Sequence, residues 1–317
     1  MPILTVRHVT TYRYKQPVAF GEHRMMLRPR DGHDQRLLDS RVDITPEPSE
    51  MWWVHDVFGN SVGVARFGGR AKELRFESTV RLDHRPLNAL DFRLEDHART
   101  HPFSYAHDEV PDLARSIERH YPDPDREVDR WARRFLSRDG MTATLDLLQA
   151  MTHAVKKEFT YIPRAVRGIQ EPTRTLKLGS GTCRDFAVLM IEAVRSLGFA
   201  ARFVSGYLYS PGHDAPRREG RGAARVGGGS THAWVRVYLP GAGWVEFDPT
   251  NGIVGNEDLI RVAIARDPAQ ALPLHGTYTG FPADFLGMDV EVSVTSDDPP
   301  ARKAAPLPEK AAVQAAR

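Results

Sequence analysis

The sequence predicts an α+β fold in which an antiparallel β-sandwich domain is followed by a domain of helices packed on an antiparallel sheet. Three observations support this prediction. Apolar and polar residues alternate with period two from residue 3 to about residue 83, which is typical of half-buried strands. The apolar period becomes 3.6 from residue 112 onward and returns to two after residue 198. Helices that precede strands, instead of alternating with them, indicate an α+β domain and not a parallel βαβ array.

The length of the chain fits two globular domains, and its small net charge argues against a highly charged binding partner. The chain has 317 residues, and a typical domain has roughly 150. Its 43 Lys and Arg against 41 Asp and Glu leave a net charge of +2, so we expect neither nucleic acid nor a membrane as partner. The single cysteine, Cys183, excludes an intrachain disulfide and suits a reducing compartment. The N-terminal residues lack the basic-then-apolar build of a signal peptide, so we expect a soluble, cytoplasmic protein.

The first domain is expected over residues 1–90. Glycine and asparagine between two of its alternating segments, at Gly59 and Asn60, favour a tight hairpin turn because both tolerate positive φ. The pair Trp52 and Trp53 could mark a binding surface. Alternating aromatics in a sandwich more often fill the core or cover an edge, and we favour that interpretation. The predicted strands are ILTVRHVTTYRY, HRMMLRP, LLDSRVDI, MWWVHDVFGNSVGVARF and LRFESTVRL.

A linker is predicted over residues 91–110, where the alternation is lost and Pro, Asp and His are frequent. It carries His97, His101 and His107. A metal site would need ligands at a defined spacing, and neither H-E-x-x-H nor C-x-x-C occurs in the chain. We therefore interpret these histidines as solvated loop residues and expect no metal.

The second domain is expected over residues 111–296. Helical spacing of apolar residues predicts helices over 112–121, 126–137, 144–159 and 183–197, the last ended by Gly198. Between the first two later strands lies a Gly- and Arg-rich stretch, 211–231, which is either disordered or a functional lid. Residues 297–317 have few large apolar groups and are expected to form a flexible tail. The predicted strands of this domain are AARFVSGYLY, HAWVRVYL, GWVEFDP, LIRVAIA and DVEVSVT.

Cys183 is the candidate nucleophile. It follows Gly-Ser-Gly-Thr and opens the apolar helix, and free N–H groups and the helix dipole at that end favour thiolate over thiol. A buried structural cysteine is the alternative, and it fits a position inside a helix better than this one. Asp185 in the first helical turn is most simply a partner for the dipole, and Arg184 receives no chemical role.

His232 and Asp248 are the candidate partners of Cys183. His232 starts one predicted strand and Asp248 ends the next, so a hairpin over the turn at 240–243 brings them to the same end. If His232 lies opposite residue 248 or 250, both side chains emerge on one face. A nucleophile, a base and a group that orients the base are what nucleophilic catalysis requires. Asn251 also follows the second strand, but a carboxylate stabilises an imidazolium better than an amide does.

Several segments resemble the bacterial transglutaminase-like superfamily. They are GTCRDFAVLMIEAVRSLGFAARFVSGYL, THAWVRVYLPGAGWVEFDPTNG and the later IARDP, while TTYRYKQPV and MMLRPR resemble the β-rich N-terminal region that often precedes its catalytic domain. The resemblance implies a papain-like catalytic domain with a Cys-His-Asp triad. By this resemblance the nucleophile falls on Cys183, the histidine on His232 and the aspartate on Asp248.

The expected activity is that of a cysteine-dependent amide hydrolase or acyltransferase on a protein or peptide substrate. It proceeds through a thioester acyl-enzyme, with the Cys183 N–H as one oxyanion donor and no cofactor. Water as second nucleophile would make the enzyme a protease or amidase, and a primary amine would make it a transglutaminase. The alternative is a non-catalytic transglutaminase-like scaffold that binds a protein partner. The second oxyanion donor, the natural substrate and the oligomeric state stay open.

Overall fold

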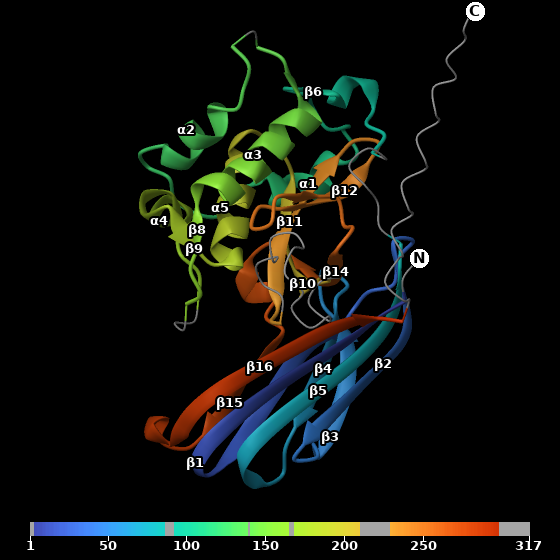
Figure 1. Ribbon diagram of the computed structural model, residues 1–317, viewed down its shortest axis with the longest axis vertical. Helices are drawn as coiled ribbons and strands as arrows, with labels where there is room; N and C mark the ends of the chain where they lie inside the picture. The colour runs from blue at the N-terminus through green and yellow to red at the C-terminus, as the bar shows by residue number, and fades with distance from the viewer. Residues whose placement is uncertain (1–2, 86–91, 139, 165–167, 210–228, 298–317) are drawn as a thin grey trace, which may run out of the picture.

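The computed structural model describes residues 3–85, 92–138, 140–164, 168–209 and 229–297. It confirms the predicted fold class, with a large antiparallel sheet beside a domain of helices packed on a second antiparallel sheet (Figure 1). The stretch 210–228 and the tail from residue 298 lie outside the described residues, so the expectations for them stay expectations.

The N-terminal sheet is built around one very long strand, β1, which has 26 residues. On one side β1 pairs with β5 and then with β4, and on the other side with β16 and then with β15, always antiparallel. Strands β2 and β3 extend the sheet by pairing with β5 and β4. The seven strands are β1 (Ile3–Arg28), β2 (Gln35–Thr45), β3 (Glu50–His55), β4 (Ser61–Arg66), β5 (Arg70–His84), β15 (Leu274–Thr279) and β16 (Phe285–Ser296).

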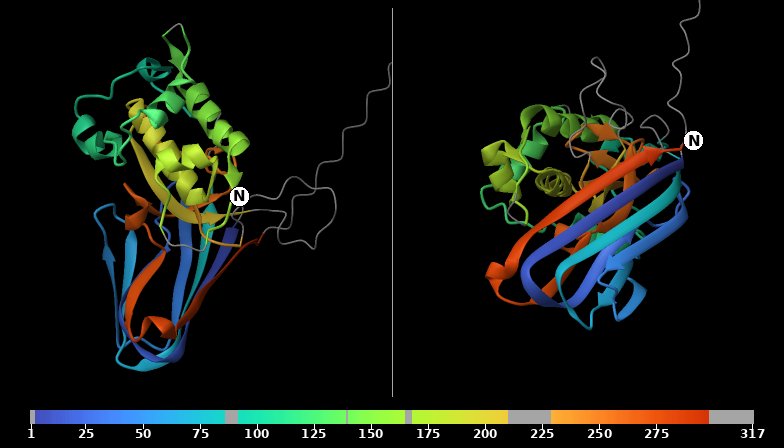
Figure 2. Two further views of the ribbon diagram at one scale, coloured as in Figure 1. Left: turned by 90° about the vertical axis from the view of Figure 1, so that its left-hand side faces the viewer. Right: turned by 60° about the horizontal axis from the view of Figure 1, so that its bottom comes forward.

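This sheet folds over on itself. The register of β1 shifts between Arg13 and Val18, and the partner strands are interrupted at the same level, between β4 and β5 and between β15 and β16. The strands turn back there, at the end far from the helices, so that two layers face each other (Figure 2). Apolar residues fill the space near the bend, among them Tyr12, Phe20 and Phe76. The two layers of the predicted sandwich thus belong to one continuous sheet. The sequence does not distinguish the two arrangements, because period-two alternation continues through a bend.

The second domain has five helices and a five-stranded sheet of order β13-β12-β11-β10-β14 among the residues that the structure describes. Helix α5 lies at the centre of this domain. Nearly all of its residues are buried, and the helix packs against β10 and β11. Its helices are α1 (Val110–Ile117), α2 (Glu127–Arg133), α3 (Thr144–Glu158), α4 (Pro172–Leu178) and α5 (Cys183–Ser196). Its sheet consists of β10 (Ala201–Leu208), β11 (His232–Leu239), β12 (Gly243–Asp248), β13 (Ile253–Val254) and β14 (Leu259–Ala265).

The four predicted helices are present. One further helix, α4, is not predicted by the spacing of apolar residues. It has only seven residues, too few to show an apolar period, although Pro172 at its start and Gly179 with φ of 57° at its end are typical boundaries. Gly198, with φ of 92°, follows α5 as predicted. The remaining short elements are η2 (Asp96–Ala98), β6 (Thr100–His101), β7 (Thr142–Ala143), β8 (Thr160–Tyr161), β9 (Ser180–Gly181), η3 (Pro268–Gln270) and η4 (Pro282–Asp284).

The expected boundary of the second domain, 111–296, needs a correction. Residues 274–296 form β15 and β16, which pair with β1 and belong to the N-terminal sheet. Alternation identifies such a segment as a strand but does not say which strand it pairs with. The predicted linker 91–110 also carries structure, since β6 within it pairs with β7.

The two domains meet along β14, the edge strand of the second sheet. Ile260 and Val262 pack against apolar side chains of β1 and β5. The Asn60 side chain donates to the Ile264 carbonyl (2.7 Å) and accepts from its N–H (2.9 Å). Gln35 makes the same two bonds to the backbone of Arg261, at 2.8 and 2.9 Å. Two side-chain amides therefore take the place of a further strand along this edge.

Candidate active site

Cys183 is the first residue of α5 and is 8% exposed. Thr182 caps the helix: its side chain accepts from the Asp185 N–H, and the Asp185 carboxylate accepts from the Thr182 N–H. This reciprocal capping box fixes where the helix begins. The sulfur is thereby held at the helix N-terminus, as the sequence predicts.

Asp185 does more than face the helix dipole. Its fully buried carboxylate also accepts from the Gln170 N–H at 2.6 Å and pairs with Arg164 at 3.0 Å. It therefore ties the segment before α4 to the start of α5. The sequence gives no signal for Gln170 or Arg164, because these contacts span 15 and 21 residues.

His232 and Asp248 are in contact, as the hairpin predicts. Val235 lies opposite Phe247 in the β11–β12 register, and this register puts Asp248 on the same face as His232 and diagonally across from it. The Nε2 atom of His232 lies 2.8 Å from Oδ2 of Asp248, and both side chains are fully buried. Because the two residues are separated by an even number of positions across the hairpin, their side chains share a face and form a direct hydrogen bond.

The Asp248 carboxylate is held by four donors. Besides His232, it accepts from the N–H groups of Thr250 (2.9 Å) and Asn251 (3.3 Å) and from the Asn251 side chain (2.8 Å). Burial opposes ionisation, but His232 and these hydrogen bonds outweigh it and hold the pKa of Asp248 below its usual value. Asn251 lies beside the pair, with its Nδ2 atom 3.4 Å from Nε2 of His232.

The imidazole of His232 favours its charged form. Burial lowers its pKa, but the Asp248 carboxylate and the nearby Cys183 sulfur outweigh burial and raise the pKa to about 10. Nε2 faces Asp248, and Nδ1 has no other hydrogen-bond partner in the described part of the chain, so Nδ1 is the nitrogen left for Cys183. The structure therefore brings Cys183 and Asp248 to the two sides of His232 as neighbours.

Three further side chains surround this group. Trp234 is fully buried and stacks on His232 with ring centres 6.0 Å apart, which agrees with a packing role. Burial, and secondarily the charge of Cys183, raise the pKa of Tyr161. Arg184 is half-buried and makes no hydrogen bond or ion pair with any described residue. Burial lowers the pKa of its guanidinium.

The described residues contain no group of three or more His, Cys, Asp or Glu side chains that could hold a metal ion. His101 stacks on Phe199, and its Nε2 atom lies 2.9 Å from the Leu197 carbonyl oxygen. Across the same residues, no helix combines the length and apolar character needed to cross a membrane.

Two family models match the chain. The bacterial transglutaminase-like N-terminal region matches residues 4–83, and the transglutaminase-like superfamily matches residues 129–249, which include Cys183, His232 and Asp248. Residues 129–249 therefore belong to the transglutaminase-like superfamily. Together with the folded β-sheet, this places a transglutaminase-like domain behind a bacterial transglutaminase-like N-terminal region.

The chain aligns with uncharacterized relatives over nearly their whole length. An uncharacterized protein of Mycobacterium leprae is 25% identical over 92% of this chain and 98% of its own length. An uncharacterized protein of Mycobacterium tuberculosis strain H37Rv is 27% identical over 90% and 91%. The structure of a candidate cysteine protease from Cytophaga hutchinsonii superposes with a TM-score of 0.67 at 18% identity, covering 95% of this chain and 93% of that one. That superposition confirms the two-domain fold.

Proposed function

We propose that the protein is a cysteine-dependent amide hydrolase or acyltransferase with Cys183 as nucleophile, His232 as acid and base, and Asp248 as the residue that orients His232. The observation that carries this proposal is the buried 2.8 Å hydrogen bond between His232 and Asp248 beside a cysteine at the start of a helix. A structural cysteine needs no such pair.

The proposed reaction starts from a thiolate and an imidazolium. The Cys183 sulfur attacks the amide carbonyl carbon, and the carbonyl π electrons move to the oxygen. The Cys183 N–H supports this oxyanion, because the first N–H groups of a helix have no partner within the helix. As the C–N bond breaks, Nδ1 of His232 gives its proton to the leaving amine or ammonia. A thioester and a neutral imidazole result.

The second half of the reaction restores the enzyme. Neutral His232 removes a proton from water or from a primary amine, which attacks the thioester carbon and expels the Cys183 thiolate. Asp248 stabilises the imidazolium in both halves, through the hydrogen bond at Nε2. Water gives a carboxylic acid, and an amine gives a new amide.

The test is a proteome-wide measurement with the full chain. A bacterial lysate is incubated with wild type or with Cys183→Ala, in the presence and absence of a biotinylated primary amine, and analysed by mass spectrometry. Hydrolysis predicts new peptide termini or conversion of glutamine to glutamate with wild type only. Amine transfer predicts biotinylated glutamine with wild type only.

The competing function is a transglutaminase-like scaffold without catalysis. It predicts identical peptide profiles for wild type and Cys183→Ala. It also predicts that iodoacetamide alkylates Cys183 no faster than a free thiol, with no effect of His232→Ala on that rate. Finding both results would refute the proposed enzyme.

A further inference from the structure

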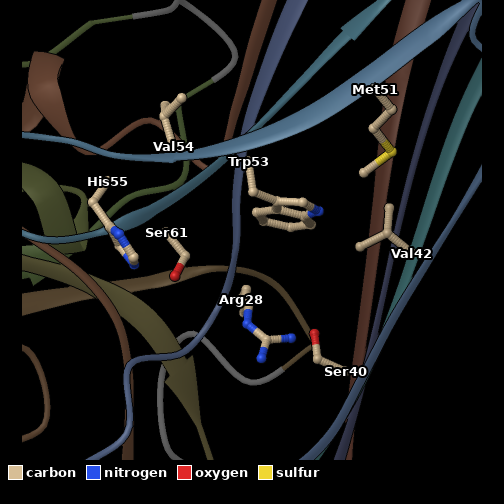
Figure 3. Close-up of a pocket in the computed structure, with 8 residues that line it drawn as sticks. All are labelled: Arg28, Ser40, Val42, Met51, Trp53, Val54, His55 and Ser61. Atoms are coloured by element: carbon tan, nitrogen blue, oxygen red, sulfur yellow. The ribbon is translucent and has the colours of Figure 1, made fainter.

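A pocket of about 450 Å³ lies in the N-terminal domain, between the two layers of the folded sheet. It is separate from Cys183 and its partners. One layer supplies Ser40 and Val42 of β2, and the facing layer supplies residues from the end of β1, from β3 and from the start of β4 (Figure 3). Near the bend, apolar side chains fill the space between the two layers. The pocket is the part of that space, farther from the bend, that they leave open.

The register of the strands explains why Trp53, His55, Ser61 and Arg28 face the pocket. Trp53 pairs with Gly63 and His55 pairs with Ser61, and paired residues point to the same face of a sheet. A bulge in β1 after Met25 brings Arg28 opposite Ser61, which turns Arg28 to this face as well. Without the bulge, regular alternation would turn Arg28 to the other face of the sheet. The bulge therefore places the Arg28 guanidinium on the pocket side.

The wall of the pocket is apolar and built around Trp53. A Cβ at Gly63 would lie 3.2 Å from the Trp53 ring, so the glycine gives that ring room to lie close to β4. Trp53 lies on the edge strand β3 and is 42% exposed, whereas Trp52 packs against the apolar core, as expected. The other apolar lining residues are Val42, Met51 and Val54.

The polar part of the pocket is cationic. Arg28 is half-buried and makes no hydrogen bond or ion pair with any residue that the structure describes. The other polar lining groups are Ser40, Ser61 and His55, and no aspartate or glutamate is among the described residues that line the pocket. Figure 3 shows Arg28 among these groups, with its guanidinium on the side of Ser40. An unpaired guanidinium next to an apolar wall favours an anion with an apolar body.

We propose that this pocket binds a small carboxylate with an apolar body, such as a medium-chain fatty acid. The planar guanidinium of Arg28 matches a carboxylate, which can accept two parallel hydrogen bonds from it. The hydrocarbon part lies against Trp53 and Met51. A volume of about 450 Å³ is at the lower end of the range for small-molecule sites, so a single small acid fits and a large ligand does not.

The test compares octanoate with octanamide, which has the same chain and no charge, in ligand-observed NMR titrations of the full-length protein. Octanoate is expected to bind at least about tenfold more tightly than octanamide. Arg28→Gln is expected to weaken octanoate binding by about the same factor and to leave octanamide within about threefold. Trp53→Ala is expected to weaken both ligands.

Arg41→Gln is the matched control. Arg41 lies on β2 between the two pocket residues of that strand, but its side chain is exposed and pairs with Asp43 at 2.8 Å. This variant should bind octanoate like wild type, and so should Cys183→Ala, because the pocket does not depend on the proposed reaction. Three results would overturn the proposal. They are equal binding of octanoate and octanamide, wild-type affinity for octanoate in Arg28→Gln, and no octanoate binding at 10 mM, which is roughly the weakest affinity that such a site could usefully have.

Discussion

The Asn251 amide donates to the same carboxylate oxygen of Asp248 that His232 contacts, at 2.8 Å in each case. The two candidate orienting residues are thus not equivalent alternatives. Asp248 contacts the imidazole directly, whereas Asn251 holds Asp248.

This arrangement predicts unequal effects of two alanine variants. Asp248→Ala is expected to lower kcat by roughly 10²–10⁴, because the imidazolium loses its carboxylate. Asn251→Ala is expected to lower kcat by about tenfold or less, since three donors to Asp248 remain. Steady-state kinetics of both purified variants checks this. A larger loss in Asn251→Ala would mean that the amide and not the carboxylate orients His232.

Cys183→Ala is expected to abolish amide turnover and to preserve the fold. The side chain is small and lies at the end of α5, so its loss should cost about 1 kcal/mol of unfolding free energy or less. The helix cap formed by Thr182 and Asp185 does not involve it. Activity and thermal melting measured on one preparation separate the two effects. Residual turnover close to wild type would exclude Cys183 as nucleophile.

The raised pKa of His232 predicts the alkaline limb of the pH profile. The leaving amine is protonated by the imidazolium, so kcat/KM should fall as pH rises through about 10, the pKa of His232 in the folded protein. Asp248→Asn removes the carboxylate that favours the imidazolium, and the limb should therefore move to lower pH. A pH series for both proteins tests the direction. An unchanged limb in Asp248→Asn would show that this carboxylate does not set the proton affinity of His232.

The same shift makes a prediction about stability. His232 has a higher pKa in the folded protein than its ordinary value of 6.5, so its charge stabilises the fold fully below pH 6.5. That contribution is lost as pH rises toward 10, because the folded state then releases the proton that it held more tightly. Urea unfolding of wild type and His232→Gln at pH 6, 8 and 10 should show a steeper decline for wild type. Parallel declines would contradict it.

Asp185→Ala should damage both stability and turnover. It removes the capping box of α5 and the buried partner of Arg164 and Gln170, a loss of about 3 kcal/mol by analogy with buried networks. Helix α5 then begins less regularly and Cys183 loses its fixed position. Asp146→Ala, in the first turn of the neighbouring helix α3, is the control and should change little. Equal melting temperatures for the two variants would show that the network is dispensable.

The end of the chain can be tested by truncation. A chain that stops after residue 297 retains β16 and is expected to fold and react like wild type. A chain that stops after residue 273 lacks β15 and β16, which cover one full side of β1. We expect that protein to be insoluble. Solubility and circular dichroism of the two truncated proteins distinguish these outcomes.

Local features of the site follow from the sequence, and distant ones do not. The helix start at Cys183 and the shared face of His232 and Asp248 depend on neighbouring residues and on strand parity, which the sequence displays. The return of residues 274–296 to the first sheet depends on pairing across more than 250 residues, as between Tyr12 and Met288. The ties of Asp185 to Arg164 and Gln170 form only once the chain has folded. Alternation and helical periodicity carry no information about such contacts.

The two amides at the edge of β14 have a consequence for how this protein can be divided. Asn60 and Gln35 occupy backbone groups that would otherwise be free to pair with another chain. Expressed alone, the cysteine-bearing half would present that strand as a template for aggregation. The N-terminal half therefore protects this edge of the second sheet, and fusion or domain-exchange experiments should transfer both halves together.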